Sequence, residues 1–162
     1  EYYCSVYHQL FGINTVALRY FNVFGRRQNP SSQYAAVVPA FVTRILQGKA
    51  PVVYGDGTQS RDFTHIDNVI DANFKALDAP SDVCGRVYNV GCGSSVTLLD
   101  LIKSINKTLG TEVKPQFDPP RAGDVMHSRA DIEQTRKNIG YNPEVDFNEG
   151  LRRTIDWYRR TN

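Results

Sequence analysis

The chain has 162 residues, of which 41% are hydrophobic and 22% are charged, and its formal net charge is +2. These proportions are typical of a globular domain with a buried core, and they exclude intrinsic disorder. The longest apolar run, Ala35 to Val42, is far shorter than the ~20 residues of a membrane-spanning helix. The near-neutral charge gives no indication of a nucleic-acid or membrane partner. Three cysteines without a paired motif predict a reduced, cytoplasmic chain.

The first third of the chain predicts a helix, a buried strand and a second helix. Residues 1 to 11 are typical of a helix tail that Gly12 would end. The run from Thr15 to Val23 is β-branched, aromatic and almost continuously apolar, which favours a parallel strand buried on both faces. Gly25 to Ser32 is typical of a loop, and the helical pattern resumes from Ala35 to Leu46.

The remainder alternates short strands with amphipathic helices. Thr97 and Asp100 have the spacing of a capping box, which predicts a helix start at Leu98. The predicted strands are 51–54, 61–65, 87–90 and 113–117, and the predicted helices are 66–77, 98–109, 131–139 and 147–160. This alternation predicts an α/β fold.

Several kinds of catalytic site find no support in the sequence. His8, His65 and His127 lie far apart without a zinc-binding spacing, and neither a GxSxG motif nor a P-loop is present. The segment from Asn89 to Ser94 follows a strand and precedes a helix, as a dinucleotide-binding loop does. It lacks the third glycine of GxGxxG, so we interpret it as a tight turn.

Two arginines stand in loops from which they could reach a bound anion. Arg61 follows a glycine turn, and Arg121 lies in a loop shaped by proline and glycine. Guanidinium groups bind phosphate oxygens bidentately, so the two could clamp a diphosphate. The alternative is that both are solvated loop residues, loosely paired with Asp62 and Asp124.

Four motifs carry a resemblance to a known family. They are LRYFNVFG (Leu18 to Gly25), GDGTQSRDF (Gly55 to Phe63), YNVG (Tyr88 to Gly91) and RAGD (Arg121 to Asp124). In order and spacing they resemble the C-terminal half of the extended short-chain dehydrogenases/reductases. More narrowly, the chain is similar to the NAD-dependent nucleotide-sugar epimerases of the UDP-glucose and UDP-N-acetylglucosamine 4-epimerase group.

The resemblance implies a set of binding residues. Phe21 would approach the nicotinamide end of NAD, Arg61 and Arg121 would bind the diphosphate of a UDP-sugar, and Asp124 would lie near the ribose hydroxyls. Substrate-binding roles are implied for Asn22, Ala36, Val37, Phe41, Tyr54, Arg61, Arg121 and Asp124, with Val52 and Ser128 as weaker candidates. The backbone around Ala36 and Val37 would meet the nucleotide base.

The chain also departs from the family pattern. It lacks the Gly-rich NAD fingerprint and the catalytic Tyr-x-x-x-Lys pair, since Tyr3 is followed four residues later by Tyr7. We expect that pair a few residues upstream of Glu1 in a longer protein, and we assign no catalytic residue to this chain. Ala36 stands where strict glucose/galactose epimerases often carry asparagine, which favours N-acetylated or other substrates.

The resemblance implies a reaction for the parent enzyme. Hydride would pass from C4 of the sugar to NAD and return to the other face, with the tyrosine as base and the lysine lowering its pKa. The chain alone is expected neither to bind NAD tightly nor to epimerise a sugar nucleotide. The alternatives are a fragment of a nucleotide-sugar 4,6-dehydratase or UDP-glucuronate decarboxylase, and a non-catalytic binding or interaction fragment.

The implied fold is the last part of a Rossmann-type parallel sheet joined to a smaller C-terminal α/β substrate-binding domain. We expect residues 1–30 to belong to the NAD-binding domain and residues 31–162 to the substrate-binding domain, with 61–90 returning to the sheet. Because Thr15 to Val23 would lack most of its partner strands, we expect the isolated chain to self-associate as a homo-oligomer.

Overall fold

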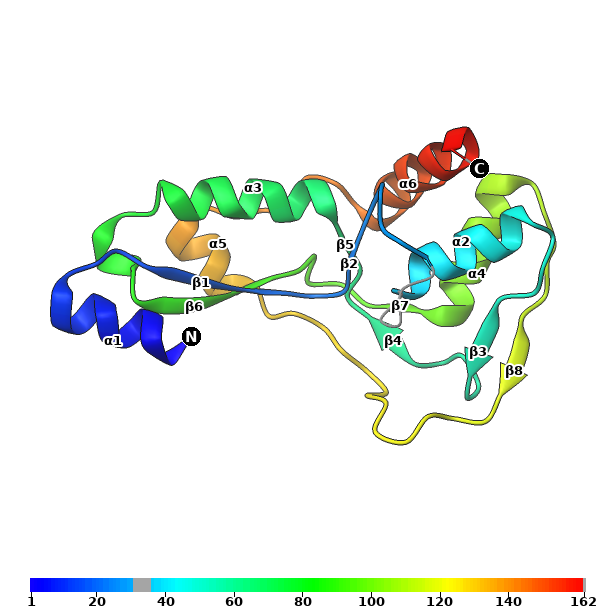
Figure 1. The fold of residues 1–162 in the computed structure, drawn as a ribbon, viewed down its shortest axis with the longest axis horizontal. Coiled ribbons are helices and arrows are strands. Elements are labelled where there is room, and N and C mark those ends of the chain that lie inside the picture. Colours follow the sequence, from blue (N-terminus) through cyan, green and yellow to red (C-terminus); the bar gives the residue numbers. More distant parts are fainter. Residues whose placement is uncertain (31–35, 162) are drawn as a thin grey trace.

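The computed structural model describes residues 1–30 and 36–161. Ser31, Ser32 and Ala35, which belong to the predicted loop and the start of the predicted second helix, lie outside the described residues. The molecule is elongated, and its helices and strands gather in two lobes, one at each end of the long axis (Figure 1). We call them the sheet lobe and the helical lobe.

The sheet lobe is built around one parallel strand pair, β1 with β6, in which Val16 lies opposite Arg86 and Tyr20 opposite Val90. Helices surround this pair, and α3 and α5 pack against it. Its elements are α1 (Tyr2–Phe11), β1 (Val16–Tyr20), α3 (Ile66–Leu77), η1 (Ser81–Val83), β6 (Arg86–Val90) and α5 (Glu133–Ile139).

The helical lobe packs three helices against one another, together with a second parallel strand pair, β3 with β8. Its elements are α2 (Val37–Leu46), β3 (Val52–Tyr54), α4 (Leu98–Leu109), β8 (Gln116–Asp118) and α6 (Phe147–Thr161). Two short pairs connect the lobes: β2 (Val23–Phe24) runs parallel to β5 (Thr64–His65), and β4 (Ser60–Arg61) runs antiparallel to β7 (Val96–Thr97).

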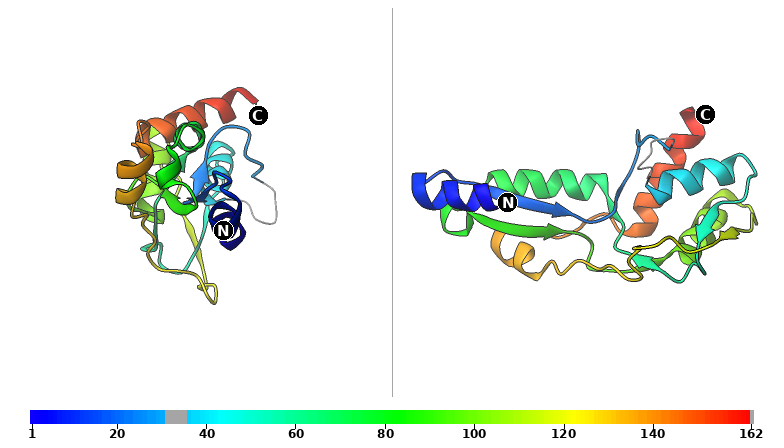
Figure 2. Two further views of the ribbon diagram at one scale, coloured as in Figure 1. Left: turned by 90° about the vertical axis from the view of Figure 1, so that its left-hand side faces the viewer. Right: turned by 60° about the horizontal axis from the view of Figure 1, so that its bottom comes forward.

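The chain crosses between the lobes repeatedly, so each lobe is assembled from distant segments. The stretch between β8 and α5 runs along the length of the molecule from the helical to the sheet lobe (Figures 1 and 2). The predicted domain boundary at residue 30 stays a prediction. The predicted return of residues 61–90 to the sheet also stays a prediction. In the sheet lobe α5 packs against β6, a contact that the prediction did not include.

The α/β fold and the positions of the six predicted helices are confirmed, with ends that differ by one or two residues. Thr97 caps α4, because its Oγ1 accepts the Asp100 N–H at 3.0 Å and donates to the Asp100 carboxylate at 2.7 Å. Gly12 ends α1 with φ of +68°, a left-handed conformation that glycine adopts without steric cost. Local sequence signals therefore decided where these helices begin and end.

The strand predicted from Thr15 to Val23 is wrong in its length. Asn22 has φ of +32°, which leaves the β region and separates β1 from β2. No residue of β1 is buried, as we expect for a strand that lacks most of its partner strands. The physical reason is that β6 is the only strand that pairs with β1 among the described residues.

Two other predicted strands are displaced or divided. The strand predicted over 61–65 is interrupted at Asp62 and Phe63, because β4 pairs with β7 while β5 pairs with β2. The strand predicted over 113–117 begins only at Gln116. The Asn106 side chain binds both the N–H and the C=O of Val113, which removes those groups from strand pairing.

Each lobe has its own hydrophobic core. The helical-lobe core gathers residues from α2, α4 and α6, among them Val42, Leu101, Ile105 and Ile155, all at or near zero exposure. The sheet-lobe core is built around Tyr88, Val90 and Tyr141. The lobes meet at the short strand pairs, and the candidate site lies on the helical side of that junction.

Candidate functional site

A cavity of about 490 Å³ opens in the helical lobe beside the junction. It is formed by α2, β3, β4, the start of α4 and the loop that follows β8. Its lining residues are Asn22, Val37, Ala40, Phe41, Val52, Tyr54, Gln59, Arg61, Leu98, Arg121, Ala122, Gly123 and Asp124. Five segments separated in sequence thus contribute to one concave surface of the size that small-molecule ligands occupy.

One wall of the cavity is the first turn of α2, from Val37 to Phe41. Ala36 is the N-cap residue and offers no side-chain oxygen to the helix. Pro39 has no N–H, so the amide hydrogens of Val37 and Val38 are the first donors of this helix. An uncapped helix start beside a cavity can donate these hydrogens to acceptor atoms on a ligand.

Arg61 lies beneath the loop that follows β8 and is held there by its own hydrogen bonds. Its Nη1 donates to the carbonyl oxygens of Ser60 at 2.9 Å and Met126 at 3.3 Å, and its Nη2 pairs with Asp124 at 2.5 Å. The side chain is 16% exposed, so the guanidinium faces the cavity from a largely enclosed position. It joins β4 to the segment that carries Asp124.

Arg121 approaches the cavity from the same loop in a different way. Its guanidinium carbon lies 3.7 Å from the centre of the Tyr54 ring, a cation–π contact. Among the described residues it forms no ion pair, so its five N–H donors stay available to a ligand. The Tyr54 ring therefore supports the Arg121 guanidinium in the wall of the cavity.

The alternative interpretation of the two arginines is wrong in one respect. Arg61 pairs with Asp124, but Asp62 is fully buried and binds neither arginine. The Asp62 carboxylate instead accepts three backbone N–H groups, from Cys92 at 2.8 Å, Gly93 at 2.9 Å and Ala130 at 3.1 Å. The Asp62 carboxylate therefore connects the turn after β6 with the segment at Ala130, which follows the cavity loop.

The Asp62 contacts also explain the turn from Asn89 to Ser94, which we interpreted as structural. The amide hydrogens of Cys92 and Gly93, which a dinucleotide loop would offer to a phosphate, are taken by Asp62. Gly91 has no room for a side chain, because a Cβ there would lie 2.4 Å from the Cβ of Ala130. Burial, with the Asp62 charge as a smaller cause, raises the pKa of the Cys92 thiol to about 11, so the thiol stays protonated.

The structure brings together most of the predicted site residues. Those that line the cavity are Asn22, Val37, Phe41, Val52, Tyr54, Arg61, Arg121 and Asp124. Three others do not line it. Ala36 lies just before its wall, Ser128 pairs with Ser60 through its N–H, and Phe21 packs against the sheet-lobe core while its N–H donates to Val90. Their binding roles, like those of the lining residues, stay predictions.

Sequence reasoning did not find Gln59 and Leu98, which also line the cavity. Gln59 is 5% exposed and donates from Nε2 to the carbonyl of Tyr54 at 2.6 Å, whereas its Oε1 has no partner in the described structure. A buried amide oxygen without a donor is costly, so a ligand donor would satisfy it. The position of Gln59 within the motif GDGTQSRDF, two residues before Arg61, was the signal that could have identified it.

Residues 1–30 and 36–161 offer little support for other kinds of site. In that part of the chain no three His, Cys, Asp or Glu side chains are grouped as metal ligands would be. There, too, no helix has the length and apolar character needed to span a membrane. Cys4, Cys84 and Cys92 are free thiols.

Comparison with known proteins gives consistent results. Residues 1–91 match the family model described as "NAD dependent epimerase/dehydratase family". A UDP-N-acetylglucosamine 4-epimerase from Methanobrevibacter ruminantium, solved in complex with UDP-N-acetylmuramic acid, superposes with a TM-score of 0.92 at 40% identity. The alignment covers 99% of this chain and 51% of that one.

Curated relatives include more than one activity. A UDP-glucose 4-epimerase of Mycolicibacterium smegmatis is 33% identical over 98% of this chain and 50% of its own length. A dTDP-glucose 4,6-dehydratase of an Actinoplanes species is 34% identical over 94% of this chain and 46% of its own length. The chain spans about half the length of the curated relatives that it matches.

Proposed function

The chain belongs to the NAD dependent epimerase/dehydratase family, and on that premise we propose that it is the UDP-sugar-binding half of an NAD-dependent 4-epimerase. The observation that carries the proposal is the cavity in which Arg61, Arg121 and the start of α2 converge. A UDP-sugar has its negative charge on the diphosphate and a flat base with amide-like edges. Two guanidinium groups and uncapped helix amides are complementary to those two parts.

Substrate binding would change the pairing of Arg61. Its Nη2 is engaged by Asp124 and its Nη1 by two carbonyl oxygens. A diphosphate would compete with the Asp124 carboxylate for the guanidinium, and the released carboxylate could accept hydrogen bonds from ribose hydroxyls. Arg121 has no such competitor among the described residues and would bind phosphate oxygens while its plane stays on Tyr54.

The described residues do not by themselves fit NAD. The amides of the turn at Cys92 and Gly93 are taken by Asp62, and Phe21, the predicted cofactor contact, packs against the sheet-lobe core. When bound to the whole enzyme, NAD supplies the hydride acceptor for transient oxidation of the sugar. The part that we assign to this chain is to bind and orient the nucleotide-sugar.

The second candidate is the corresponding half of a nucleotide-sugar 4,6-dehydratase. The similarity to a dTDP-glucose 4,6-dehydratase supports it, because the identity is comparable to that with the epimerase relative. Either enzyme would need the same diphosphate contacts. Product analysis of the whole enzyme with UDP-glucose and UDP-N-acetylglucosamine separates them, since a dehydratase yields a 4-keto-6-deoxy sugar and an epimerase yields the C4 epimer.

The diphosphate contacts are tested by substitution in the whole enzyme. We expect Arg61→Ala and Arg121→Ala each to weaken UDP binding at least about tenfold, because each removes a charge-assisted contact. Isothermal titration calorimetry measures the effect. Arg86→Ala is the matched control, since this exposed arginine donates to the Asp82 carbonyl in the sheet lobe. Unchanged UDP affinity in both cavity variants would remove the assignment.

Self-association is a further part of the proposal. Tyr2, Tyr3, Leu10 and Phe11 on α1 are 66–90% exposed, and β1 has an unpaired edge among the described residues. An apolar helix face beside an open strand edge favours pairing with a second copy. We expect light scattering of the isolated chain at micromolar concentration to show dimers or larger species. A clean monomer at that concentration contradicts the expectation.

A further inference from the structure

A second cavity, of about 330 Å³, shares no lining residue with the candidate site. It lies between α6, the start of α3 and the loop after β2. Its lining residues are Arg26, His65, Asp67, Arg153, Asp156, Trp157 and Arg160. Nothing in the proposed function uses this cavity, yet three arginines and a histidine contribute to its walls.

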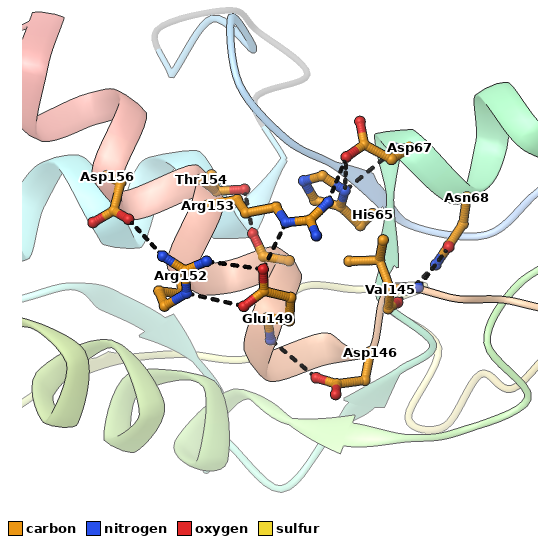
Figure 3. Close-up of polar contacts among 11 residues, drawn as sticks. His65, Asp67, Asn68, Val145, Asp146, Glu149, Arg152, Arg153, Thr154 and Asp156 are labelled. Carbon is orange, nitrogen blue, oxygen red and sulfur yellow. Dashed lines mark hydrogen bonds and ion pairs between the residues drawn. The ribbon is translucent and has the colours of Figure 1, made fainter.

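Arg153 is fixed in the wall of this cavity by two carboxylates. Its Nε donates to Glu149 at 2.7 Å and its Nη1 donates to Asp67 at 2.9 Å (Figure 3). Within the described structure its Nη2 has no partner, so one edge of an immobilised guanidinium remains free. Hydrogen bonds from Arg152 and Arg153 lower the pKa of Glu149 to about 2, which keeps this network ionised at neutral pH.

The acidic residues of the cavity are already neutralised. Asp67 accepts from Arg153, and Asp156 accepts from Arg152 at 3.0 Å (Figure 3). In contrast, Arg26 and Arg160 form no ion pair among residues 1–30 and 36–161. Three arginines against two aspartates leave the lining with a net positive charge, concentrated on two guanidinium groups that have no counterion.

His65 adds a buried and rigidly oriented donor. It is 3% exposed, and its Nδ1 lies 3.3 Å from the Asp67 amide nitrogen and 3.4 Å from an Asp67 carboxylate oxygen. In the neutral form whose Nδ1 accepts the Asp67 N–H, and in the protonated ring, Nε2 carries a hydrogen that has no acceptor in the described structure. The Phe24 ring packs edge-on against the imidazole, and a Cβ at Gly150 would come within 2.9 Å of the His65 Cβ. The ring therefore has little freedom to turn away.

We propose that this cavity binds the phosphate group of a small metabolite. A tetrahedral phosphate accepts hydrogen bonds from several directions, which suits the free edge of Arg153, the exposed guanidinium groups of Arg26 and Arg160, and the Nε2–H of His65. The volume exceeds that of one phosphate, and the indole of Trp157 supplies an apolar wall for an organic substituent. A phosphate monoester fills both parts of the cavity.

Trp157 makes the proposal directly measurable, because it is the only tryptophan of the chain. The experiment titrates the 162-residue chain with inorganic phosphate and with phenyl phosphate, and follows the indole fluorescence against sodium chloride of equal ionic strength. We expect a saturable change with both phosphates and none with the chloride. Tighter binding of phenyl phosphate identifies the ester as the ligand, and equal binding identifies free phosphate.

Substitutions of single arginines test whether phosphate binds in this cavity. Arg26→Ala and Arg160→Ala are each expected to raise the half-saturation concentration about tenfold, since each removes one charge-assisted contact. Arg159→Ala is the matched control, because this exposed arginine neighbours Arg160 on α6 but does not line the cavity. Arg61→Ala tests independence from the candidate site and is expected to have no effect. The absence of a saturable change, or an equal loss in the Arg159 variant, overturns the proposal.

Discussion

The two lobes differ most clearly in what one helix of each buries, α4 in the helical lobe and α1 in the sheet lobe. In the helical lobe, Leu101 and Ile105 of α4 are completely buried between α2 and α6. In the sheet lobe, α1 buries no residue at all, and its Leu10 is 70% exposed. Both helices end at a left-handed glycine, but only α4 gathers its apolar side chains on one face. A local signal that ends a helix therefore does not supply tertiary packing, which also needs an apolar face and a partner surface.

We expect the largest effect on stability from a pair of matched leucine substitutions that test this difference. We expect Leu101→Ala to lower the free energy of unfolding by about 2–5 kcal/mol, since it leaves a cavity in a closed core. At a concentration low enough for the chain to be monomeric, Leu10→Ala on α1 should change it by less than about 0.5 kcal/mol, because the side chain is then in solvent. Urea denaturation followed by circular dichroism measures both. Equal losses would mean that α1 has a packing partner in solution.

The second prediction concerns the connection between the lobes. We expect Asp62→Asn to lower the free energy of unfolding by about 2–3 kcal/mol, because three buried amides lose a charged acceptor and one faces the new NH₂ group. The Cys92 thiol should then react faster with a thiol reagent, since its turn is no longer held. Asp56→Asn is the control, because among the described residues that exposed carboxylate binds only Thr58. An unchanged thiol reaction rate would contradict the connecting role.

The smallest effect concerns pH at the junction. Burial lowers the pKa of His65 below its ordinary value of 6.5, with the Arg153 and Arg26 charges lowering it further and Asp67 and Glu149 opposing them. The unfolded chain therefore takes up this proton first as the pH falls. The stability contributed by the neutral ring is present above pH 6.5 and is lost as the pH falls toward the folded pKa.

This pH dependence is checked by urea denaturation between neutral and mildly acidic pH. His65→Asn keeps a side-chain acceptor at the helix start and has no group that titrates in this range. We expect its free energy of unfolding to fall less over that interval than the free energy of the original chain. The same decrease in both proteins would exclude His65 as the cause.

Much of the fold follows from local residue order. The capping pair Thr97 and Asp100, the left-handed Gly12 and the apolar periodicity of the helices involve neighbours in sequence, so the pattern predicts them well. Strands were predicted less accurately, because their pairing depends on distant segments. Asn22 divides one predicted strand, and Asp62 turns inward toward amides 30 and 68 residues away.

The candidate site, like the fold, was predictable from the sequence only in part. The sequence by itself placed Arg61 just beyond a glycine turn and Arg121 in a loop, and it supplied the chemistry to bind an anion, because that chemistry belongs to the side chain. Only the tertiary structure decided that Arg61 pairs with Asp124, that Arg121 lies on Tyr54, and that Gln59 joins the cavity wall. These contacts join residues far apart in the chain. Their energies depend on distance and burial, which residue order does not contain.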